Sequence, residues 1–241
     1  MQLFHRKKQE RGHFNHGWLD TYHSFSFADY YDPKFMGFSA LRVINEDKIA
    51  AQRGFGMHPH KNMEIITYVM KGALEHKDSM GNGSVIKPGE IQYMSAGKGV
   101  YHSEWNSSPE EVHLLQIWIM PDRQMMGLEP AYGQINFMEK QAPQNGWRLL
   151  ASPSGDFNSI KIRTSTHLWQ SQLPAGQTND FKLAKNRCAW LQIAKGQLEV
   201  KCDGESKLLE AGDGLAVIDC RSIEMLASQD VEALLFDLPG E

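Results

Sequence analysis

The sequence predicts an all-β protein, a sandwich or a barrel, from three observations. Short segments rich in β-branched and aromatic residues recur, such as EIITYVMKG (64–72) and VHLLQIWIM (112–120). Turns rich in glycine and proline separate them, such as SMGNGS (79–84), at the spacing of roughly 8–12 residues that is typical of this fold class. Helical periodicity is hard to find in the same region.

Each expected strand of the first half ends at a turn signal. The segment 64–72 ends on Gly72, and two glycines flank Asn82 in the turn after the next segment. PGE (88–90) and SSPEE (107–111) make two further breaks, because proline and glycine interrupt regular pairing. The expected strands of this half are 64–72, 73–78, 91–97, 101–106 and 112–120.

A second β pattern follows a stretch of different character. Residues 121–143 contain methionines, glycines and prolines without alternation, and we interpret them as a connection between two halves. The strand patterns after it lie in residues 190–202, 208–218 and 232–240.

The two halves share a crude repeat. In both, a strand runs into Lys-Gly, at residues 71–72 and 195–196, and another strand then leads to a glycine turn. Nine of the ten histidines lie at or before His113, so a metal-ligand set is expected in the first copy only. We place the domains at residues 1–133 and 134–241, and expect no metal ligands in the second.

Composition restricts the class of protein. The chain has 241 residues, of which 41% are hydrophobic and 22% charged, as in an ordinary soluble protein of one large or two small domains. The net charge of −4 and the pI near 6.2 argue against direct nucleic-acid binding. The single basic run, residues 6–8, is interpreted as a solvated terminus.

Localisation is inferred from what the sequence lacks. The first residues contain no apolar signal region, and no run of about 18 apolar residues indicates a membrane span. Cys188, Cys202 and Cys220 are an odd, widely spaced set without a CxxC motif, which favours reduced thiols. We therefore expect a cytoplasmic protein that does not bind membranes.

Two pairs of side chains at i and i+2 predict a metal centre. His58 and His60 flank Pro59, and His102 and Glu104 repeat the spacing on another expected strand. Side chains two apart on a strand point to the same face, so two such pairs across adjacent strands would supply three imidazoles and one carboxylate. That set suits Fe(II), Mn, Co, Ni, Cu or Zn.

Alternation leaves the identity of the carboxylate ligand open. Glu64 competes with Glu104, and a glutamate beside a histidine pair can instead hydrogen-bond to a ligand imidazole. His76 and His113 have no partner at two-residue spacing, so we do not predict them as ligands.

These motifs resemble those of a known family. His58-x-His60-(x3)-Glu64 with His102-(x3)-Asn106 is similar to the two signature motifs of the cupin superfamily, and the chain resembles its pirin branch. The resemblance is dense from about residue 11 to 121 and looser afterwards. The stretches that carry it are residues 16–47, 54–72, 78–82, 94–104, 112–121 and 234–239.

The resemblance implies a bicupin, in which two double-stranded β-helix (jelly-roll) barrels pack together and only the first binds metal. Carried over to this sequence, the ligands are His58, His60, His102 and Glu104, which disfavours Glu64. One divalent transition metal is implied, with Fe(II) favoured over Zn, Ni, Co, Mn or Cu.

Bacterial members of this branch are similar to quercetin 2,3-dioxygenases, which cleave the flavonol heterocycle with O2 and release carbon monoxide. The implied partners are therefore a small aromatic flavonol and O2, with Glu104 as the catalytic residue that accepts the 3-hydroxyl proton. Phe25 and Phe27 are candidates for the pocket wall or for core packing. The alternative is a pirin-like, redox-sensing regulator that uses its metal to act on protein partners.

Overall fold

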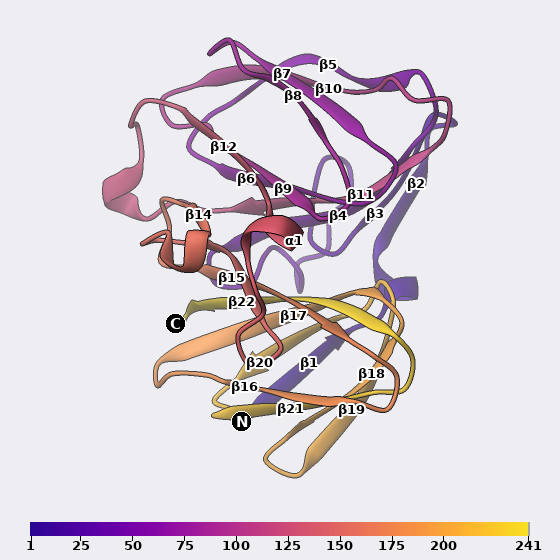
Figure 1. The fold of residues 1–241 in the computed structure, drawn as a ribbon, viewed down its shortest axis with the longest axis vertical. Helices are drawn as coiled ribbons and strands as arrows, with labels where there is room; N and C mark the ends of the chain where they lie inside the picture. Colours follow the sequence, from indigo (N-terminus) through magenta and orange to yellow (C-terminus); the bar gives the residue numbers. More distant parts are fainter. Residues whose placement is uncertain (241) are drawn as a thin grey trace. The chain divides into compact units, whose positions relative to one another are not determined.

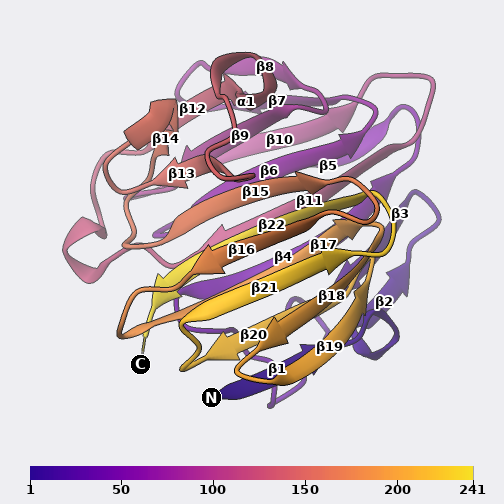
Figure 2. The same cartoon turned by 60° about the horizontal axis from the view of Figure 1, so that its bottom comes forward.

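The computed structural model describes residues 1–240, and nearly all regular structure in them is antiparallel β-sheet. The chain divides into two compact units, drawn in Figures 1 and 2. We call them the N-terminal unit, Gly12–Lys140 with Ile160–Thr164, and the C-terminal unit, Met1–Arg11 and Gln141–Ser159 with residues 165–240. Each unit has a larger and a four-stranded sheet, which confirms the predicted all-β bicupin.

In the N-terminal unit, the larger sheet has the order β12-β9-β6-β11-β4-β3-β2 and the smaller one β5-β10-β7-β8. Apolar side chains of the smaller sheet and of β4, β6 and β11 form one of its cores, which includes Ile49, Val69 and Leu74. The strands are β2 (Gly12–Asn15), β3 (Leu19–His23), β4 (Leu41–Ile49), β5 (Arg53–His60), β6 (Glu64–Lys71), β7 (Leu74–Asp78), β8 (Gly83–Ile86), β9 (Glu90–Ser95), β10 (Val100–Asn106), β11 (Val112–Ile119), β12 (Ala131–Asn136) and β14 (Ile160–Lys161).

In the C-terminal unit, the larger sheet runs β1-β20-β17-β22-β15-β13 and the smaller one β16-β21-β18-β19. The strands are β1 (Gln2–Arg6), β13 (Arg148–Ser152), β15 (His167–Leu173), β16 (Thr178–Lys182), β17 (Arg187–Lys195), β18 (Gln197–Cys202), β19 (Glu205–Glu210), β20 (Gly214–Ile218), β21 (Ser222–Ala227) and β22 (Val231–Pro239). The helices of residues 1–240 are short: α1 (Phe137–Lys140) and the 3-10 turns Lys8–Glu10, Arg123–Met125 and Asp156–Asn158. None of them has the length and apolarity needed to cross a membrane.

The first strand belongs to the C-terminal unit. In Figure 1, the indigo β1 lies among the yellow and orange strands, and its residues pair with β20 from Gln2↔Ile218 to Arg6↔Gly214. Next to it, Asp213 accepts hydrogen bonds from His5 Nε2 (2.9 Å) and the backbone N–H of Lys8 (2.7 Å). The two compact units therefore have different limits from the predicted domains, 1–133 and 134–241, whose boundary falls within β12.

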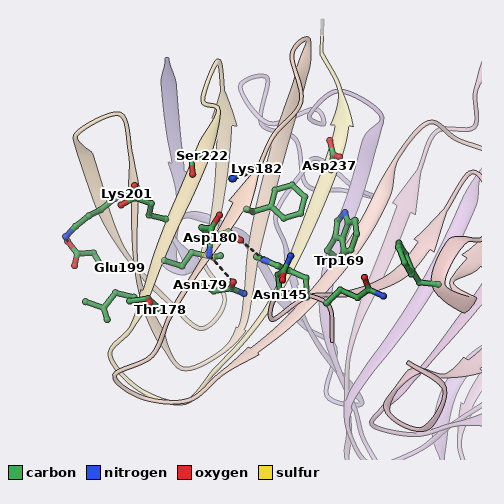
Figure 3. Close-up of a pocket in the computed structure, with 17 residues that line it drawn as sticks. Asn145, Trp169, Thr178, Asn179, Asp180, Lys182, Glu199, Lys201, Ser222 and Asp237 are labelled. Atoms are coloured by element: carbon green, nitrogen blue, oxygen red, sulfur yellow. Dashed lines mark hydrogen bonds and ion pairs between the residues drawn. The ribbon is translucent and has the colours of Figure 1, made fainter. Parts of the chain in front are cut away.

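The C-terminal unit has a hollow of about 1180 Å³. Figure 3 shows Glu199 and Lys201 at one end of it and Trp169 and Asp237 at the other. Its walls mix aromatic rings with charges of both signs. Among the described residues, none of those that line it is a histidine, so the hollow presents no imidazole ligand.

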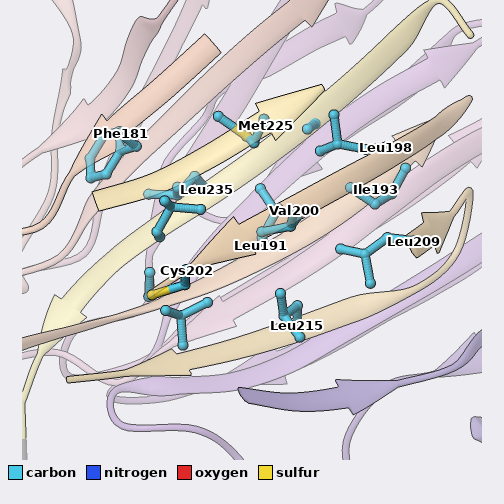
Figure 4. Packing of buried hydrophobic residues seen from close by; sticks show 14 of the residues in the cluster. Phe181, Leu191, Ile193, Leu198, Val200, Cys202, Leu209, Leu215, Met225 and Leu235 are labelled. Carbon is cyan, nitrogen blue, oxygen red and sulfur yellow. The ribbon is translucent and has the colours of Figure 1, made fainter. Parts of the chain in front are cut away.

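The core of the C-terminal unit contains a correction. Figure 4 shows its cluster of buried leucine, isoleucine and valine side chains, with Cys202 among them. Cys202 and Cys220 form a disulfide with Cα atoms 6.2 Å apart, a distance within the range that a disulfide spans. The expectation of three reduced thiols is therefore wrong for this pair, whereas Cys188 is buried and forms no disulfide.

Candidate metal centre and its relatives

Strand pairing brings three histidines together. β5 and β10 run antiparallel, with His102 directly opposite His58 and Val100 opposite His60. Opposed residues on one face of such a pair lie close together, and the ring centroids of the three imidazoles are 4.4–4.8 Å apart. Their ligand nitrogens lie within 4.8 Å of one another. The structure thus assembles the three predicted histidines into one cluster.

The cluster presents unprotonated nitrogens. His58 Nδ1 lies 2.8 Å from the carbonyl oxygen of Gly56; because a carbonyl only accepts, Nδ1 carries the proton and Nε2 is free. His102 Nε2 is buried and has no hydrogen-bond partner. Burial, with repulsion from neighbouring imidazoles, lowers the pKa of His60 to about 4 and that of His102 to about 2. Neutral imidazoles with free nitrogens fit a divalent transition metal ion.

Glu104 lines the same cavity as the three histidines, but its side chain is fixed by hydrogen bonds from neighbouring side chains. Its carboxylate accepts hydrogen bonds from the Gln116 amide (2.9 and 3.0 Å) and the Thr67 hydroxyl (3.3 Å). Burial raises its pKa, and the hydrogen bonds from Gln116 oppose that shift. Within residues 1–240, Glu104 is not part of the group of ligand atoms that includes the three histidines. Its role as a fourth ligand therefore stays a prediction.

Glu64, the alternative ligand, has partners of its own. Its carboxylate accepts hydrogen bonds from the Tyr93 hydroxyl, the Ser95 hydroxyl (2.6 Å) and the backbone N–H of Arg163 (2.9 Å). The side chain is almost completely buried and does not line the cavity of the histidines. Glu64 thus connects β6 and β9 to the segment around Arg163, which favours a structural role.

Aromatic side chains form walls of the cavity that the three histidines line, which has a volume of about 300 Å³. Trp118 meets the ring of His60 edge to face, with centroids 4.8 Å apart, and Phe27 meets Trp118 in the same way at 5.2 Å. Phe25 is instead buried in the core. Trp118 was not predicted, because one aromatic residue in an apolar strand carries no signal for a pocket. The lining residues are Phe27, Asn45, Asp47, Phe55, His58, His60, His102, Glu104, Gln116 and Trp118.

Two polar side chains of β4 also line this cavity. Asn45 is buried, and its Oδ1 has no hydrogen-bond partner. Asp47 accepts a 2.5 Å hydrogen bond from the Thr21 hydroxyl. Burial raises the pKa of Asp47 to about 7, against the opposing effect of that bond. The cavity therefore combines aromatic walls with buried polar groups, the usual character of a small-molecule site.

Comparison with known proteins identifies the family of this chain. The Pirin family matches residues 4–119, and the family described as quercetinase C-terminal cupin domain matches residues 149–238. A quercetin 2,3-dioxygenase of Escherichia coli K12 is 48% identical over 238 residues, covering 98% of this chain and 99% of that protein. The chain belongs to the pirin family.

Other pirin relatives extend the comparison. A pirin-like protein of Caulobacter vibrioides is 40% identical over 226 residues, covering 94% of this chain and 95% of its own. The crystal structure of the E. coli bacterial pirin YhhW in complex with nickel(II) is 47% identical, with a TM-score of 0.91 and full coverage of both chains. A quercetin 2,3-dioxygenase structure from Acinetobacter baumannii, 21% identical with a TM-score of 0.76, covers 99% of this chain and 86% of its own, and supports the fold alone. This chain is thus a quercetin 2,3-dioxygenase-like pirin.

Proposed function

We propose that this pirin is a metal-dependent dioxygenase that cleaves the heterocycle of quercetin-like flavonols with O2 and releases carbon monoxide. The observation that carries the proposal is the cluster of His58, His60 and His102, whose nitrogens converge within 4.8 Å in a cavity that also contains a buried carboxylate. The nickel(II) complex of YhhW supports a divalent ion at such a site. Fe(II) is our first choice of metal, ahead of Zn, Ni, Co, Mn and Cu.

The walls of the cavity suit a flat aromatic substrate. Phe27 and Trp118 offer ring faces and edges, and aromatic pairs favour offset or edge-to-face contact with a planar ring system. Asn45 Oδ1 is an unpaired acceptor that a flavonol hydroxyl can satisfy. These side chains would hold the substrate against the histidines and exclude water from the reacting ring.

Proton transfer is assigned to Glu104. A bound divalent ion supplies Lewis acidity, which lowers the pKa of the flavonol 3-hydroxyl. Glu104 is buried beside the histidines, and its ionised form accepts hydrogen bonds from Gln116 and Thr67. We assign the carboxylate to accept the 3-hydroxyl proton, because a general base must lie within reach of the proton that it removes.

The test combines metal content with turnover on one sample purified without chelator. Metals are counted by mass spectrometry, and quercetin absorbance is followed with and without O2 after loading with each candidate metal ion. We expect metal-dependent loss of quercetin, with one carbon monoxide released for each O2 consumed. Glu104→Gln and His58→Ala should abolish turnover, whereas Glu111→Gln, which changes an exposed glutamate, should not.

Two outcomes would contradict the proposal. Bound metal without turnover under any loading condition would refute the dioxygenase and favour a regulator that acts on protein partners. Turnover that continues in His58→Ala would show that the histidine cluster is not the reaction centre.

A further inference from the structure

His76 and Asp78 form a buried pair next to the histidine cluster. Both lie on β7, which pairs with β10, and their side chains are 0% exposed. His76 Nε2 lies 3.3 Å from Asp78 Oδ2, and His76 Nδ1 lies 3.4 Å from Nδ1 of His102. A chain of contacts therefore runs from Asp78 through His76 to one of the three clustered histidines.

The turn after β7 fixes Asp78 as an acceptor. Its carboxylate receives the backbone N–H groups of Met80 (2.9 Å) and Asn82 (3.0 Å), and the side-chain amide of Asn82 (2.9 Å). A carboxylate that already receives several N–H groups offers His76 only acceptor oxygens. The Asp78–Ser79–Met80–Gly81–Asn82 turn therefore sets the direction of the next hydrogen bond.

The direction of each hydrogen bond then follows. Because Asp78 accepts, neutral His76 carries its proton on Nε2, and its Nδ1 becomes an acceptor. His102 Nδ1 must then donate to His76 Nδ1, which leaves His102 Nε2 without a proton. That nitrogen is the one that is buried without a hydrogen-bond partner.

We propose that His76 and Asp78 are positioning residues, which hold His102 in the tautomer whose Nε2 is free to bind a divalent metal ion. This inference rests on the proposed metal centre but not on the substrate. It gives His102 the kind of outer partner that His58 already has in the carbonyl of Gly56. Such partners orient the ligand ring and increase its basicity.

Packing keeps water away from the hydrogen bonds that link Asp78, His76 and His102. The ring of Tyr132 lies over His76, with centroids 5.3 Å apart, and its hydroxyl bonds to Ser84 (2.5 Å) and Gln134 (3.0 Å). The pair is thus closed off from solvent. A hydrogen bond is electrostatically stronger in such a buried place than in water.

The test uses zinc alone and two substitutions of His76. His76→Leu removes both ring nitrogens and should weaken zinc binding by about 10- to 100-fold, as loss of an outer partner usually does. His76→Gln keeps a donor for Asp78 and an acceptor for His102, and should retain most of the affinity. Zinc affinity is measured by competition with a chromophoric chelator. His113→Leu is the matched control, since His113 forms a similar pair with Glu46 (2.9 Å) outside the cluster.

A spectroscopic measurement separates positioning from a merely structural role. In long-range ¹H–¹⁵N NMR spectra of the metal-free protein, His102 should be protonated on Nδ1 in the wild type and should show a mixture of tautomers in His76→Leu. The proposal fails if wild-type His102 is protonated on Nε2. It fails equally if His76→Leu binds zinc as tightly as the wild type, or if His113→Leu loses as much affinity as His76→Leu. A wild-type protein that binds no zinc would refute the metal centre, while the spectra would still decide the tautomer.

Discussion

Substitution of Glu64 by glutamine separates a structural carboxylate from a metal ligand. The carboxylate accepts three hydrogen bonds, from Tyr93, Ser95 and the backbone of Arg163, and bonds to a charged group contribute roughly 1.5–3 kcal/mol each. The glutamine amide keeps one acceptor oxygen, so one of the three donors would face its NH2 group. The remaining hydrogen bonds would then go to a neutral acceptor instead of a charged one. We expect the free energy of unfolding to fall by about 2–4 kcal/mol.

The assay is urea denaturation of the metal-free protein. With a slope of about 2 kcal/mol per molar urea, this loss lowers the midpoint by roughly 1–2 M. Zinc stoichiometry under native conditions should stay at the wild-type value, because Glu64 does not line the cavity of the histidines. Glu111→Gln serves as the exposed control. A Glu64→Gln protein with a normal midpoint but without bound metal would refute this reasoning and make Glu64 a ligand.

Three further predictions concern both units. Replacing Cys202 and Cys220 by serine removes a disulfide of sequence separation 18 and should lower the free energy of unfolding by about 3 kcal/mol. In urea denaturation, the difference between variant and wild type should vanish once the wild-type disulfide is reduced. A difference that persists would contradict the prediction. Burial raises the pKa of Asp213, but hydrogen bonds from His5 and nearby backbone lower it overall. The carboxylate therefore stabilises the fold above its unfolded pKa, near 3.8, and this contribution is lost as pH falls through the folded pKa. The stability gap between wild type and Asp213→Asn should shrink on acidification in urea titrations at several pH values, and a constant gap would argue against it. Phe27→Ala should raise KM for quercetin roughly 2- to 10-fold with little change in kcat, and an unchanged KM would remove Phe27 from the substrate wall.

Local patterns predicted those features that depend on alternation within one strand. Two-residue spacing correctly placed His58 and His60 on one face of β5, and pairing places His102 of the neighbouring β10 on the same face of the sheet. The same rule could not choose between Glu64 and Glu104, because that choice depends on which donors each carboxylate meets in the folded unit. Sequence spacing therefore predicted the imidazole cluster but left its carboxylate open.

Features that depend on pairing between strands were missed. His76 reaches the site only because β7 pairs with β10 in a register that places it opposite Glu104. The link predicted to be irregular contains β12, whose residues AYGQIN show little apolar alternation but pair with β9. Likewise, Cys202 ends β18 and Cys220 lies between β20 and β21, and only folding of the unit brings their sulfurs together.

The place of β1 has a consequence for synthesis. His5 and Asp213, which meet beside β20, are 208 positions apart in the sequence. At 5–20 residues per second, a ribosome needs roughly 10–40 s to make the intervening chain. During that time Gln2–Arg6 has no native neighbour, and an unpaired strand can pair with another nascent chain. The C-terminal unit therefore cannot close around β1 until β20 has been synthesised, long after β1 itself.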